Sequence, residues 1–341
     1  MNSDDGEQKV PLRVAINGFG RIGRSVLRAA LENDNPAIDF VAINDLGAAD
    51  ANCHLLNFDS IHGRLRPEAV IEGDMMVAGR HKIKLTSERD PAALDWSNVD
   101  LVMECTGIFT TKEAASLHLT AGADRVLISA PGTDSDLTCV YGVNHQDITA
   151  DHKIISNASC TANCLSPVAQ VLNDTIGIKT GYMTTIHAYT GDQRLQDTLH
   201  KDLRRARAAA MSMIPTSTGA ARAVGLVLPE LKGKLDGSAI RVPTANVSVV
   251  DLKFVPQRDT SIDEVNKLLT NAAHGKLKGV LDVTDKPLVS IDFNHDPHSS
   301  IVALDQTMVT ADGLVRVLSW YDNEWGFSNR MLDMAAYLAN H

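Results

Sequence analysis

Cys160 is the residue of this sequence whose surroundings most favour chemistry. It lies in the segment SNASCTANC, residues 156–164, between a predicted strand at 153–156 and a predicted helix at 161–173. A thiol at a helix N-terminus faces the positive end of the helix dipole, which lowers the thiol pKa and favours the reactive thiolate. Cys160 is therefore the candidate nucleophile. The remaining cysteines are expected to be packed side chains without a chemical role: Cys53, Cys105, Cys139 and Cys164.

A nucleophilic thiol needs a base, and the chain has 12 histidines from which to choose one. His187 lies near the end of a predicted strand, 182–188, just before a long polar loop, so its ring is expected to face a cleft. An imidazole there can hold the Cys160 thiolate by ion pairing and take the proton of a hemithioacetal hydroxyl. A buried structural histidine is the alternative that position alone leaves open. No histidine or cysteine spacing indicates a metal site.

A glycine-rich turn links a predicted strand at 12–17 to a predicted helix at 25–32. Its spacing fits the G-x-G-x-x-G pattern, in which a tight turn brings a pyrophosphate close to a helix N-terminus. The glycines of the pattern are Gly18, Gly20 and Gly23. Asp45 follows the next predicted strand, 39–43, where a carboxylate can accept hydrogen bonds from ribose hydroxyls. Because this carboxylate repels a 2′-phosphate, the sequence favours NAD over NADP.

Three groups of polar residues suit phosphate anions. Hydroxyls flank the nucleophile at Ser159 and Thr161, and the segment TSTG, residues 216–219, precedes a predicted helix whose N–H groups can face an anion. Arg241 interrupts an apolar strand and must find a partner or line a cleft. The long loop adds further arginines, for which a solvated or subunit-contact role is the alternative: Arg204, Arg205 and Arg207. Two anion sites near one thiol indicate a phosphorylated substrate and a second phosphate.

Composition restricts the class of protein. A chain of 341 residues with 44% hydrophobic and 22% charged residues is long enough for two globular domains. A net charge of −10 disfavours a nucleic-acid-binding face. An odd number of cysteines without paired spacing indicates free thiols in a reducing compartment. Residues 1–10 are polar, lack the features of a signal peptide, and are expected to form a disordered leader, and no apolar run is long enough to span a membrane. The expected location is the cytoplasm.

The order of predicted elements indicates two kinds of domain. In the first half, apolar strands alternate with helices, which predicts an α/β domain with a Rossmann-type parallel sheet. After residue 158, longer alternating strands predict an α+β catalytic domain with a mixed, mainly antiparallel sheet. The loop at about 191–214 is long enough to be functional, and an amphipathic helix is expected at 328–340.

Five segments together resemble the phosphorylating glyceraldehyde-3-phosphate dehydrogenase family. The resemblance extends from about residue 12 to residue 338, and its motifs are more specific than the glycine turn. The segments are NGFGRIGR at 17–24, SNASCTANCL at 156–165, HAYT at 187–190, RVPTANVS at 241–248 and WYDNE at 320–324. The nucleophile of the family falls on Cys160 and its base on His187.

The resemblance also implies which residues bind ligands. The attacking inorganic phosphate would be held by Ser159, Thr161, Thr218, Gly219 and Arg205, and the phosphate of the substrate by Thr190 and Arg241. The cofactor, NAD, would contact the glycines and Arg21, Ile22, Asp45, Arg89, Ser129 and Asn323. The C-terminal helix would return to the first domain, giving an NAD-binding domain of residues 11–159 and 323–341 around a catalytic domain of residues 160–322. The arginine-rich loop would line a subunit interface of a homotetramer.

Two positions depart from the most familiar pattern of the family. Thr198 stands where many strictly NAD-using members carry leucine, which leaves room for NADP, although Asp45 argues for NAD. Phe327 stands where tyrosine is common near the nicotinamide, so ring packing is kept and a hydroxyl is lost.

The expected function is glycolytic oxidation and phosphorylation of D-glyceraldehyde 3-phosphate with NAD, through a thioester on Cys160, to give 1,3-bisphosphoglycerate. The alternatives within the enzyme class are an erythrose-4-phosphate dehydrogenase and an NADP-preferring biosynthetic enzyme. A binding protein that keeps the fold, or a cysteine hydrolase, fits less well, because neither needs the nucleophile, the glycine turn and both anion sites together.

Overall fold

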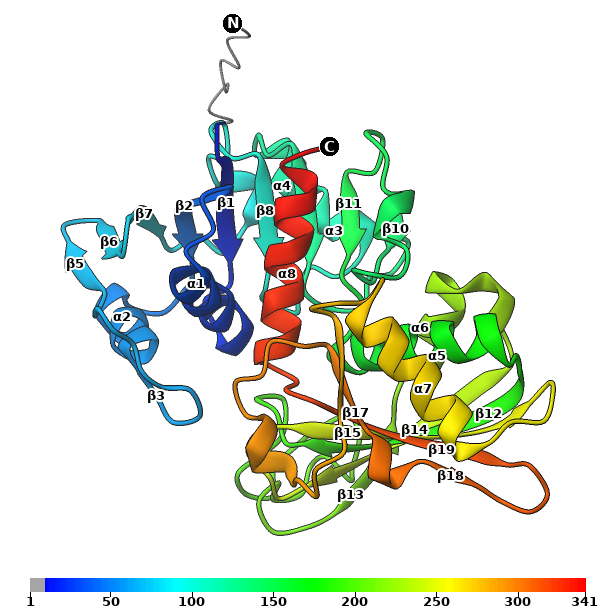
Figure 1. Cartoon of the computed structure of the whole chain (residues 1–341). Helices are drawn as coiled ribbons and strands as arrows, with labels where there is room; N and C mark the ends of the chain where they lie inside the picture. The colour runs from blue at the N-terminus through cyan, green and yellow to red at the C-terminus, as the bar shows by residue number, and fades with distance from the viewer. Residues whose placement is uncertain (1–9) are drawn as a thin grey trace, which may run out of the picture.

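Two large β-sheets organise the chain, which the computed structural model describes over residues 10–341 (Figure 1). The expected leader at 1–10 therefore lies outside the described residues except for Val10, which is exposed. No helix within the described part of the chain is long and apolar enough to cross a bilayer.

The first sheet has nine strands in the order β10-β11-β9-β8-β1-β2-β7-β6-β5. Its strands from β10 to β7 are parallel, and β6 and β5 extend one edge in antiparallel pairing. The strands are β1 (Leu12–Asn17), β2 (Ile38–Asn44), β5 (Val70–Glu72), β6 (Met75–Ala78), β7 (His81–Thr86), β8 (Leu101–Glu104), β9 (Arg125–Ile128), β10 (Leu137–Thr138) and β11 (Ile154–Ser156). The Rossmann-type parallel sheet expected from the apolar strand runs is confirmed, whereas the antiparallel edge was not predicted.

Helices cover this sheet, and one of them comes from the far end of the chain. They are α1 (Arg21–Asn33), α2 (Ala49–Asn57), α3 (Lys112–Ala115), α4 (Leu117–Thr120) and α8 (Trp325–Leu338). The C-terminal helix α8 lies beside α1 and buries its apolar side chains in the same core as β1 and β8 (Figure 1). Between β8 and β9 the chain forms the two short helices α3 and α4.

The second sheet has the strand order β13-β14-β12-β15-β19-β17-β16, with β18 paired to β19. Only β12–β14 and β16–β17 pair in parallel, so the expected mixed, mainly antiparallel sheet is confirmed. The strands are β12 (Ile178–Ala188), β13 (Ile214–Ser217), β14 (Leu235–Val242), β15 (Ser248–Pro256), β16 (Leu281–Thr284), β17 (Ser300–Ala303), β18 (Met308–Val309) and β19 (Val315–Tyr321). A separate small hairpin pairs β3 (Phe58–Asp59) with β4 (Gly63–Arg64).

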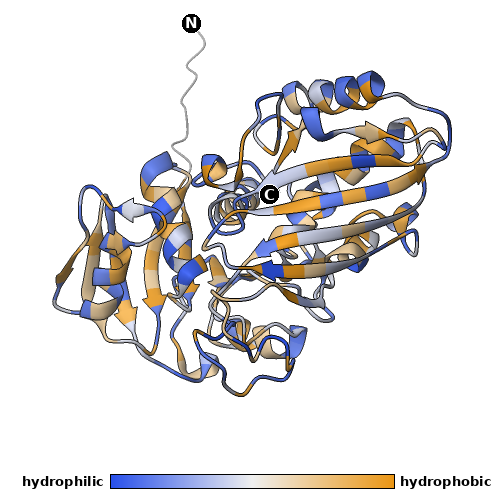
Figure 2. Cartoon of the chain, turned by 90° about the horizontal axis from the view of Figure 1, so that it is seen from below, coloured by the Kyte–Doolittle hydropathy of each residue, from blue (hydrophilic) through white to orange (hydrophobic). Residues whose placement is uncertain are grey.

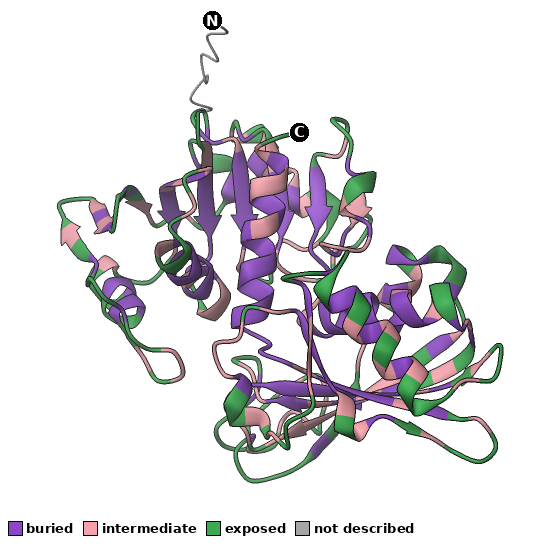
Figure 3. Cartoon of the chain, viewed as in Figure 1, coloured by how far each residue is buried: buried purple, intermediate pink, exposed green. Residues whose placement is uncertain are grey.

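Three helices pack on one face of the second sheet and enclose the largest core cluster. They are α5 (Cys160–Thr175), α6 (Ala220–Val227) and α7 (Ile262–His274). Apolar and polar residues alternate along the strands of this sheet (Figure 2), as a sheet with one covered face requires. In Figure 3 the central strands and α8 are mostly buried, whereas the loops below the second sheet are exposed. Among these loops is the arginine-rich segment between β12 and β13.

Candidate active site

Cys160 is the first residue of α5, as the sequence indicated. The chain leaves β11 at Ser156 and turns through Ala158, whose φ of 55° is in the left-handed region. Ser159 then caps the helix, because its hydroxyl accepts a hydrogen bond from the N–H of Ala162 at 3.1 Å. This turn presents the thiol and the first N–H groups of α5 to the boundary between the two sheets. Cys160 packs against both main core clusters.

His187 faces Cys160 and meets it in a defined orientation. The Nε2 atom of His187 is 3.5 Å from the Sγ atom of Cys160, and Nδ1 is 2.7 Å from the carbonyl oxygen of Ala188. A proton on Nδ1 donates to this carbonyl and leaves the lone pair of Nε2 directed at the thiol. The strand end β12 thereby places a base next to the candidate nucleophile.

Burial determines the resting charges of this pair. It raises the pKa of the Cys160 thiol, and the nearby charge of Arg241 and hydrogen bonds from Thr161 offset the rise only in part. Burial, followed by the charge of Arg241, lowers the pKa of His187 to about 3. The expectation of a lowered thiol pKa and an ion pair is therefore corrected: enclosure of both groups favours a neutral thiol beside a neutral imidazole. A neutral imidazole can accept the thiol proton.

Tyr321 supports this pair and was not singled out from the sequence. Its hydroxyl is buried and lies 2.9 Å from the hydroxyls of Thr161 and Thr185, and its ring meets the His187 ring edge-on at a centroid distance of 5.9 Å. Tyr321 therefore joins the start of α5 to the strand that carries His187. The only sequence signal was its place in the WYDNE segment. Thr161 is buried and its hydroxyl lies in hydrogen-bond contact with Tyr321, so the expected contact of this side chain with phosphate is not supported. Its main-chain N–H, at the start of α5, remains the candidate for phosphate binding.

The glycine turn has the open geometry that a pyrophosphate needs. At Gly18, φ is +91° and a side chain would overlap Thr106, whereas at Gly23 a Cβ would lie 2.3 Å from the carbonyl oxygen of Gly18. At Gly20, no atom lies within 4 Å of the position of a Cβ, and α1 starts at the next residue without a side-chain cap. The first N–H groups of α1, from Arg21 and Ile22, therefore remain available to an anion.

A cavity of about 380 Å³ extends from this turn between the carboxyl ends of β1, β2 and β8. Its lining includes Gly18, Gly20, Asp45 and Arg89 from the expected cofactor set. One carboxylate oxygen of Asp45 accepts a hydrogen bond from the N–H of Phe19 at 2.7 Å, and the other accepts one from the N–H of Gly47 at 2.8 Å. The carboxylate is thus fixed at the cavity wall, where a ribose would lie. These residues fit a dinucleotide.

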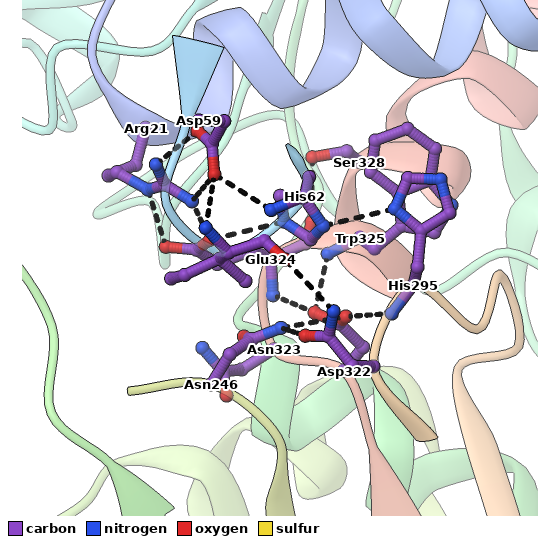
Figure 4. Close-up of polar contacts among 12 residues, drawn as sticks. Arg21, Asp59, His62, Asn246, His295, Asp322, Asn323, Glu324, Trp325 and Ser328 are labelled. Carbon is purple, nitrogen blue, oxygen red and sulfur yellow. Dashed lines mark hydrogen bonds and ion pairs between the residues drawn. The ribbon is translucent and has the colours of Figure 1, made fainter. Parts of the chain in front are cut away.

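The Arg21 side chain has a different role from the one expected. It forms ion pairs with Asp59 and with Glu324, and it does not line the cavity (Figure 4). Its Nε donates to Glu324 at 2.9 Å, so the guanidinium ties α1 to the segment that precedes α8. Only the main-chain N–H of Arg21 remains a candidate for the cofactor.

The same close-up shows how the start of α8 is held. Asp322 accepts hydrogen bonds from the N–H groups of Glu324 and Trp325, and from the N–H of His295 in a distant loop (Figure 4). The ring of His295 stacks on Trp325 at a centroid distance of 3.6 Å. These contacts fix the WYDNE segment between the two sheets.

The two remaining cofactor candidates, Ser129 and Asn323, do not line the cavity themselves. Ser129 follows β9, donates its N–H to the carbonyl of Glu104, and contacts Cys105, which lines the cavity. Asn323 is buried and accepts a hydrogen bond from the Ser248 hydroxyl at 2.7 Å. That hydroxyl in turn accepts the N–H of Ala188 at 3.0 Å, so Asn323 is linked to the strand end that bears His187.

The residues expected to bind the substrate phosphate lie together next to His187. Arg241 donates from Nη1 to the Thr190 hydroxyl and to the Ala188 carbonyl, each at 3.1 Å, and lies 3.1 Å from Nδ1 of His187. Its Nε is buried and has no hydrogen-bond partner among the described residues. A buried guanidinium N–H without a partner is suited to an incoming anion.

Of the residues expected to bind the second phosphate, Arg205, Thr218 and Gly219 lie at β13 or directly after it, whereas Ser159 and Thr161 lie at the start of α5. Arg205 donates from Nε to the Thr216 hydroxyl at 3.0 Å and from Nη1 to Asp192 at 2.9 Å. Thr218 and Gly219 follow directly, with Gly219 exposed at the start of α6 and no atom within 4 Å of its Cβ position. Arg205 thus folds the arginine-rich loop back onto the segment that leads into α6. Asp192 was not predicted from the sequence.

The structure gives no chemical role to Arg207 or to the cysteines other than Cys160. Arg207 pairs with Asp197 at the surface. Burial raises the pKa of Cys105 and of Cys164 to about 12, so both thiols are held neutral. Within the described residues no cluster of three or more histidine, cysteine or carboxylate side chains could hold a metal ion.

The sequence of the chain matches two protein-family models. Residues 12–112 match the model described as glyceraldehyde 3-phosphate dehydrogenase, NAD binding domain, and residues 159–323 match the model of the C-terminal domain of the same enzyme.

Similar full-length proteins carry the same name. A glyceraldehyde-3-phosphate dehydrogenase of Cereibacter sphaeroides is 64% identical over 95% of this chain and 97% of its own length. Another, from Xanthobacter flavus, is 64% identical with the same coverage. One from Zymomonas mobilis is 60% identical over 96% of this chain and 98% of its own length. Since both halves of the molecule and nearly its whole length match in this way, the chain belongs to the glyceraldehyde-3-phosphate dehydrogenase family.

Proposed function

We propose that this protein oxidises D-glyceraldehyde 3-phosphate with NAD and inorganic phosphate to 1,3-bisphosphoglycerate. The observation that carries the proposal is the Cys160–His187 pair, 3.5 Å apart, with Arg241 contacting the base. A thiol, a base and an anion-binding guanidinium in one place suit an aldehyde that carries a phosphate. The same chain has a cavity at the glycine turn that fits a dinucleotide, and a cysteine hydrolase would need no such cavity.

Cys160 and His187 carry out the covalent step. The Sγ of Cys160 adds to the aldehyde carbon as its proton passes to Nε2 of His187. His187 then gives this proton to the carbonyl oxygen, which becomes the hydroxyl of a hemithioacetal and leaves Nε2 free again. The N–H of Cys160 at the helix start, together with the His187 ring, stabilises the developing charge on that oxygen. Bound NAD supplies the acceptor for the hydride that leaves the same carbon. His187 takes the hydroxyl proton, and the product on Cys160 is a thioester.

The two anion sites then determine what happens to the thioester. Arg241 and Thr190 hold the phosphate of the substrate, so the acyl group stays next to Cys160. Arg205, Ser159, Thr218 and Gly219 hold inorganic phosphate, together with the N–H of Thr161. Attack of a phosphate oxygen on the acyl carbon breaks the carbon–sulfur bond, gives the acyl phosphate and returns Cys160 to its thiol form with a proton from His187.

The residues around the cavity support NAD as the cofactor. Gly20 leaves room for the pyrophosphate, the first N–H groups of α1 face it, and Asp45 receives the ribose hydroxyls. The fixed Asp45 carboxylate repels a 2′-phosphate, which supports NAD over NADP even though Thr198 is exposed in the loop. Asn323 would hold the nicotinamide end near His187.

The sheet arrangement supports the proposed division into domains. Residues 11–159 supply the strands and helices of the first sheet, and α8 within residues 323–341 shares its core. Residues 160–322 supply the whole of the second sheet. On this division the chain crosses between the domains at Cys160 and again at Asn323, so both crossings lie at the site.

A homotetramer and a cytoplasmic location are part of the same proposal. Large apolar side chains project from the arginine-rich loop into solvent, which supports a subunit contact there: Leu195, Leu199, Leu203, Met211 and Met213. Five free cysteines support a reducing compartment. Light scattering of the purified protein would measure a mass of four chains if the loop makes the expected contact.

An absorbance assay of reduced nicotinamide tests the activity. With glyceraldehyde 3-phosphate, NAD and phosphate, we expect turnover that stops after one equivalent of thioester when phosphate is omitted. Cys160→Ser should abolish both turnover and the thioester burst, since an alcohol is a poorer nucleophile here. Parallel assays with erythrose 4-phosphate as the substrate, and with NADP as the cofactor, measure how strongly the enzyme prefers glyceraldehyde 3-phosphate and NAD. Sustained oxidation without phosphate or arsenate, or full activity of the serine variant, would exclude the proposed mechanism.

A further inference from the structure

We propose that Asp192 is a built-in counter-anion of the two phosphate sites, whose carboxylate competes with both phosphates and so sets their affinity. This inference rests on the proposed function, because it concerns the same two sites. Asp192 begins the arginine-rich loop, between Thr190 and Arg205 in the chain. No feature of the sequence singled it out.

The contacts of Asp192 join the two sites. Its Oδ1 accepts a hydrogen bond from the Thr190 hydroxyl, which belongs to the expected substrate-phosphate site. Its Oδ2 accepts one from Nη1 of Arg205, at 2.9 Å, which belongs to the expected site of the attacking phosphate. A single carboxylate therefore takes one donor from each site.

Thr190 cannot serve Asp192 and a phosphate at the same time. Its hydroxyl has one proton, which it gives to Asp192, while its oxygen accepts from Nη1 of Arg241 at 3.1 Å. A phosphate monoester is mostly dianionic at neutral pH, so its oxygens accept hydrogen bonds and compete with Asp192 for the proton of Thr190. Binding of the substrate phosphate at Thr190 therefore replaces the Asp192 contact.

At Arg205, too, a bound phosphate competes with the Asp192 carboxylate. Its Nε is fixed by the Thr216 hydroxyl at 3.0 Å, so Nη1 is the part of the guanidinium that turns toward Asp192. A phosphate bound at Nη1 comes close to the Asp192 carboxylate, and the two like charges repel. The Asp192 side chain is 44% exposed, so the repulsion is partly screened by salt.

This arrangement explains why a carboxylate stands in a site for anions. It balances part of the charge of Arg205 and Arg241, and it keeps the donors of both sites oriented. The product carries both phosphates, so a competing anion next to both sites favours its release.

The variant Asp192→Asn tests the inference. It removes the charge and keeps the size, so at low ionic strength we expect KM for inorganic phosphate and for the aldehyde substrate to fall about three- to tenfold, as loss of one nearby repulsive charge allows. The difference from wild type should shrink at about 0.5 M salt. In parallel, inorganic phosphate should raise the thermal unfolding midpoint of the variant at lower concentrations than that of wild type.

Two further variants sharpen the test. Asp192→Glu keeps the charge and should have KM values near those of wild type. Asp197→Asn removes the same charge from the same loop, but Asp197 pairs with Arg207 and contacts neither phosphate site, so its KM values should not change. A raised or unchanged KM in Asp192→Asn, or an equal fall in Asp197→Asn, would overturn the inference. If wild type itself fails to oxidise the aldehyde, the proposed function fails, while the thermal titration with phosphate still tests Asp192.

Discussion

At the residue scale, chemistry in this protein depends on how completely Cys160 and His187 are enclosed. Position in the sequence identified the thiol at a helix start and a histidine at a strand end. Enclosure decides their protonation, because burial raises the pKa of the thiol and lowers that of the imidazole. Enclosure thus favours the neutral forms of both groups, between which the thiol proton can move when the substrate arrives.

Replacing His187 tests its role as a neutral base through two quantities, kcat and the free energy of unfolding. His187→Gln should lower kcat about 10²–10⁴-fold, since the general base is lost. An unfolded histidine titrates at about 6.5, whereas His187 in the fold titrates at about 3, so only the unfolded state gains the proton between these values. This group thus makes wild type lose stability as pH falls from about 6.5 to about 3.

The measurement is urea unfolding across that pH range. Because the glutamine variant has no such group, its free energy of unfolding should fall less steeply with decreasing pH than that of wild type. Equal slopes for the two proteins would show that His187 is not held neutral by the fold.

At the element scale, the glycine turn shows how one motif serves two requirements. Gly18 and Gly23 are needed by the fold, because a side chain at either would meet the backbone of a neighbouring residue. Gly20 is needed only for what binds there, because the space beside it is open. The sequence pattern predicted all three glycines alike, and packing separates their roles.

Alanine substitutions at two of these glycines should separate fold from binding. Gly23→Ala places a Cβ 2.3 Å from the Gly18 carbonyl, so unfolding in urea should show a loss of about 1–3 kcal/mol. Gly20→Ala should leave stability nearly unchanged and raise KM for NAD several-fold. A stable Gly23→Ala protein with normal KM for NAD would contradict the packing seen at this turn.

At the scale of the whole molecule, α8 and the segment before it connect the two sheets near the candidate active site. Arg21 at the start of α1 reaches Asp59 and Glu324, and Asn323, the neighbour of Glu324, is tied through Ser248 to the strand of His187. The cofactor cavity and the catalytic pair are thus positioned by residues about 300 positions apart in the chain (Figure 4).

Glu324→Gln should weaken this connection measurably. Loss of a charge-assisted hydrogen bond to the partly buried Arg21 is expected to lower the free energy of unfolding by about 1–3 kcal/mol at pH 7. The Arg21 partner lowers the pKa of Glu324, although burial opposes it, so this stabilisation is present above the unfolded pKa and is lost as pH falls. The difference between variant and wild type should therefore shrink toward acidic pH.

The matched control for this prediction is Glu68→Gln. Glu68 pairs with Arg64 at the surface, where both side chains are exposed, so the loss should stay below about 1 kcal/mol. Equal losses in the two variants would mean that Glu324 contributes no more than a surface pair.

The sequence by itself determined what depends on local pattern: the strand–turn–helix around the glycines, the thiol at a helix start, the two sheet types and the family. These follow from periodicity, glycine and capping residues, which act over a few positions. Tertiary structure alone decided what depends on residues far apart. These properties are the pKa shifts of Cys160 and His187 through burial, the hydrogen bond between Tyr321 and Thr161, the turning of Arg21 away from the cavity and the place of Asp192 between the phosphate sites. Enclosure and hydrogen-bond partners set these properties, and neither can be read from the spacing of residues along the chain.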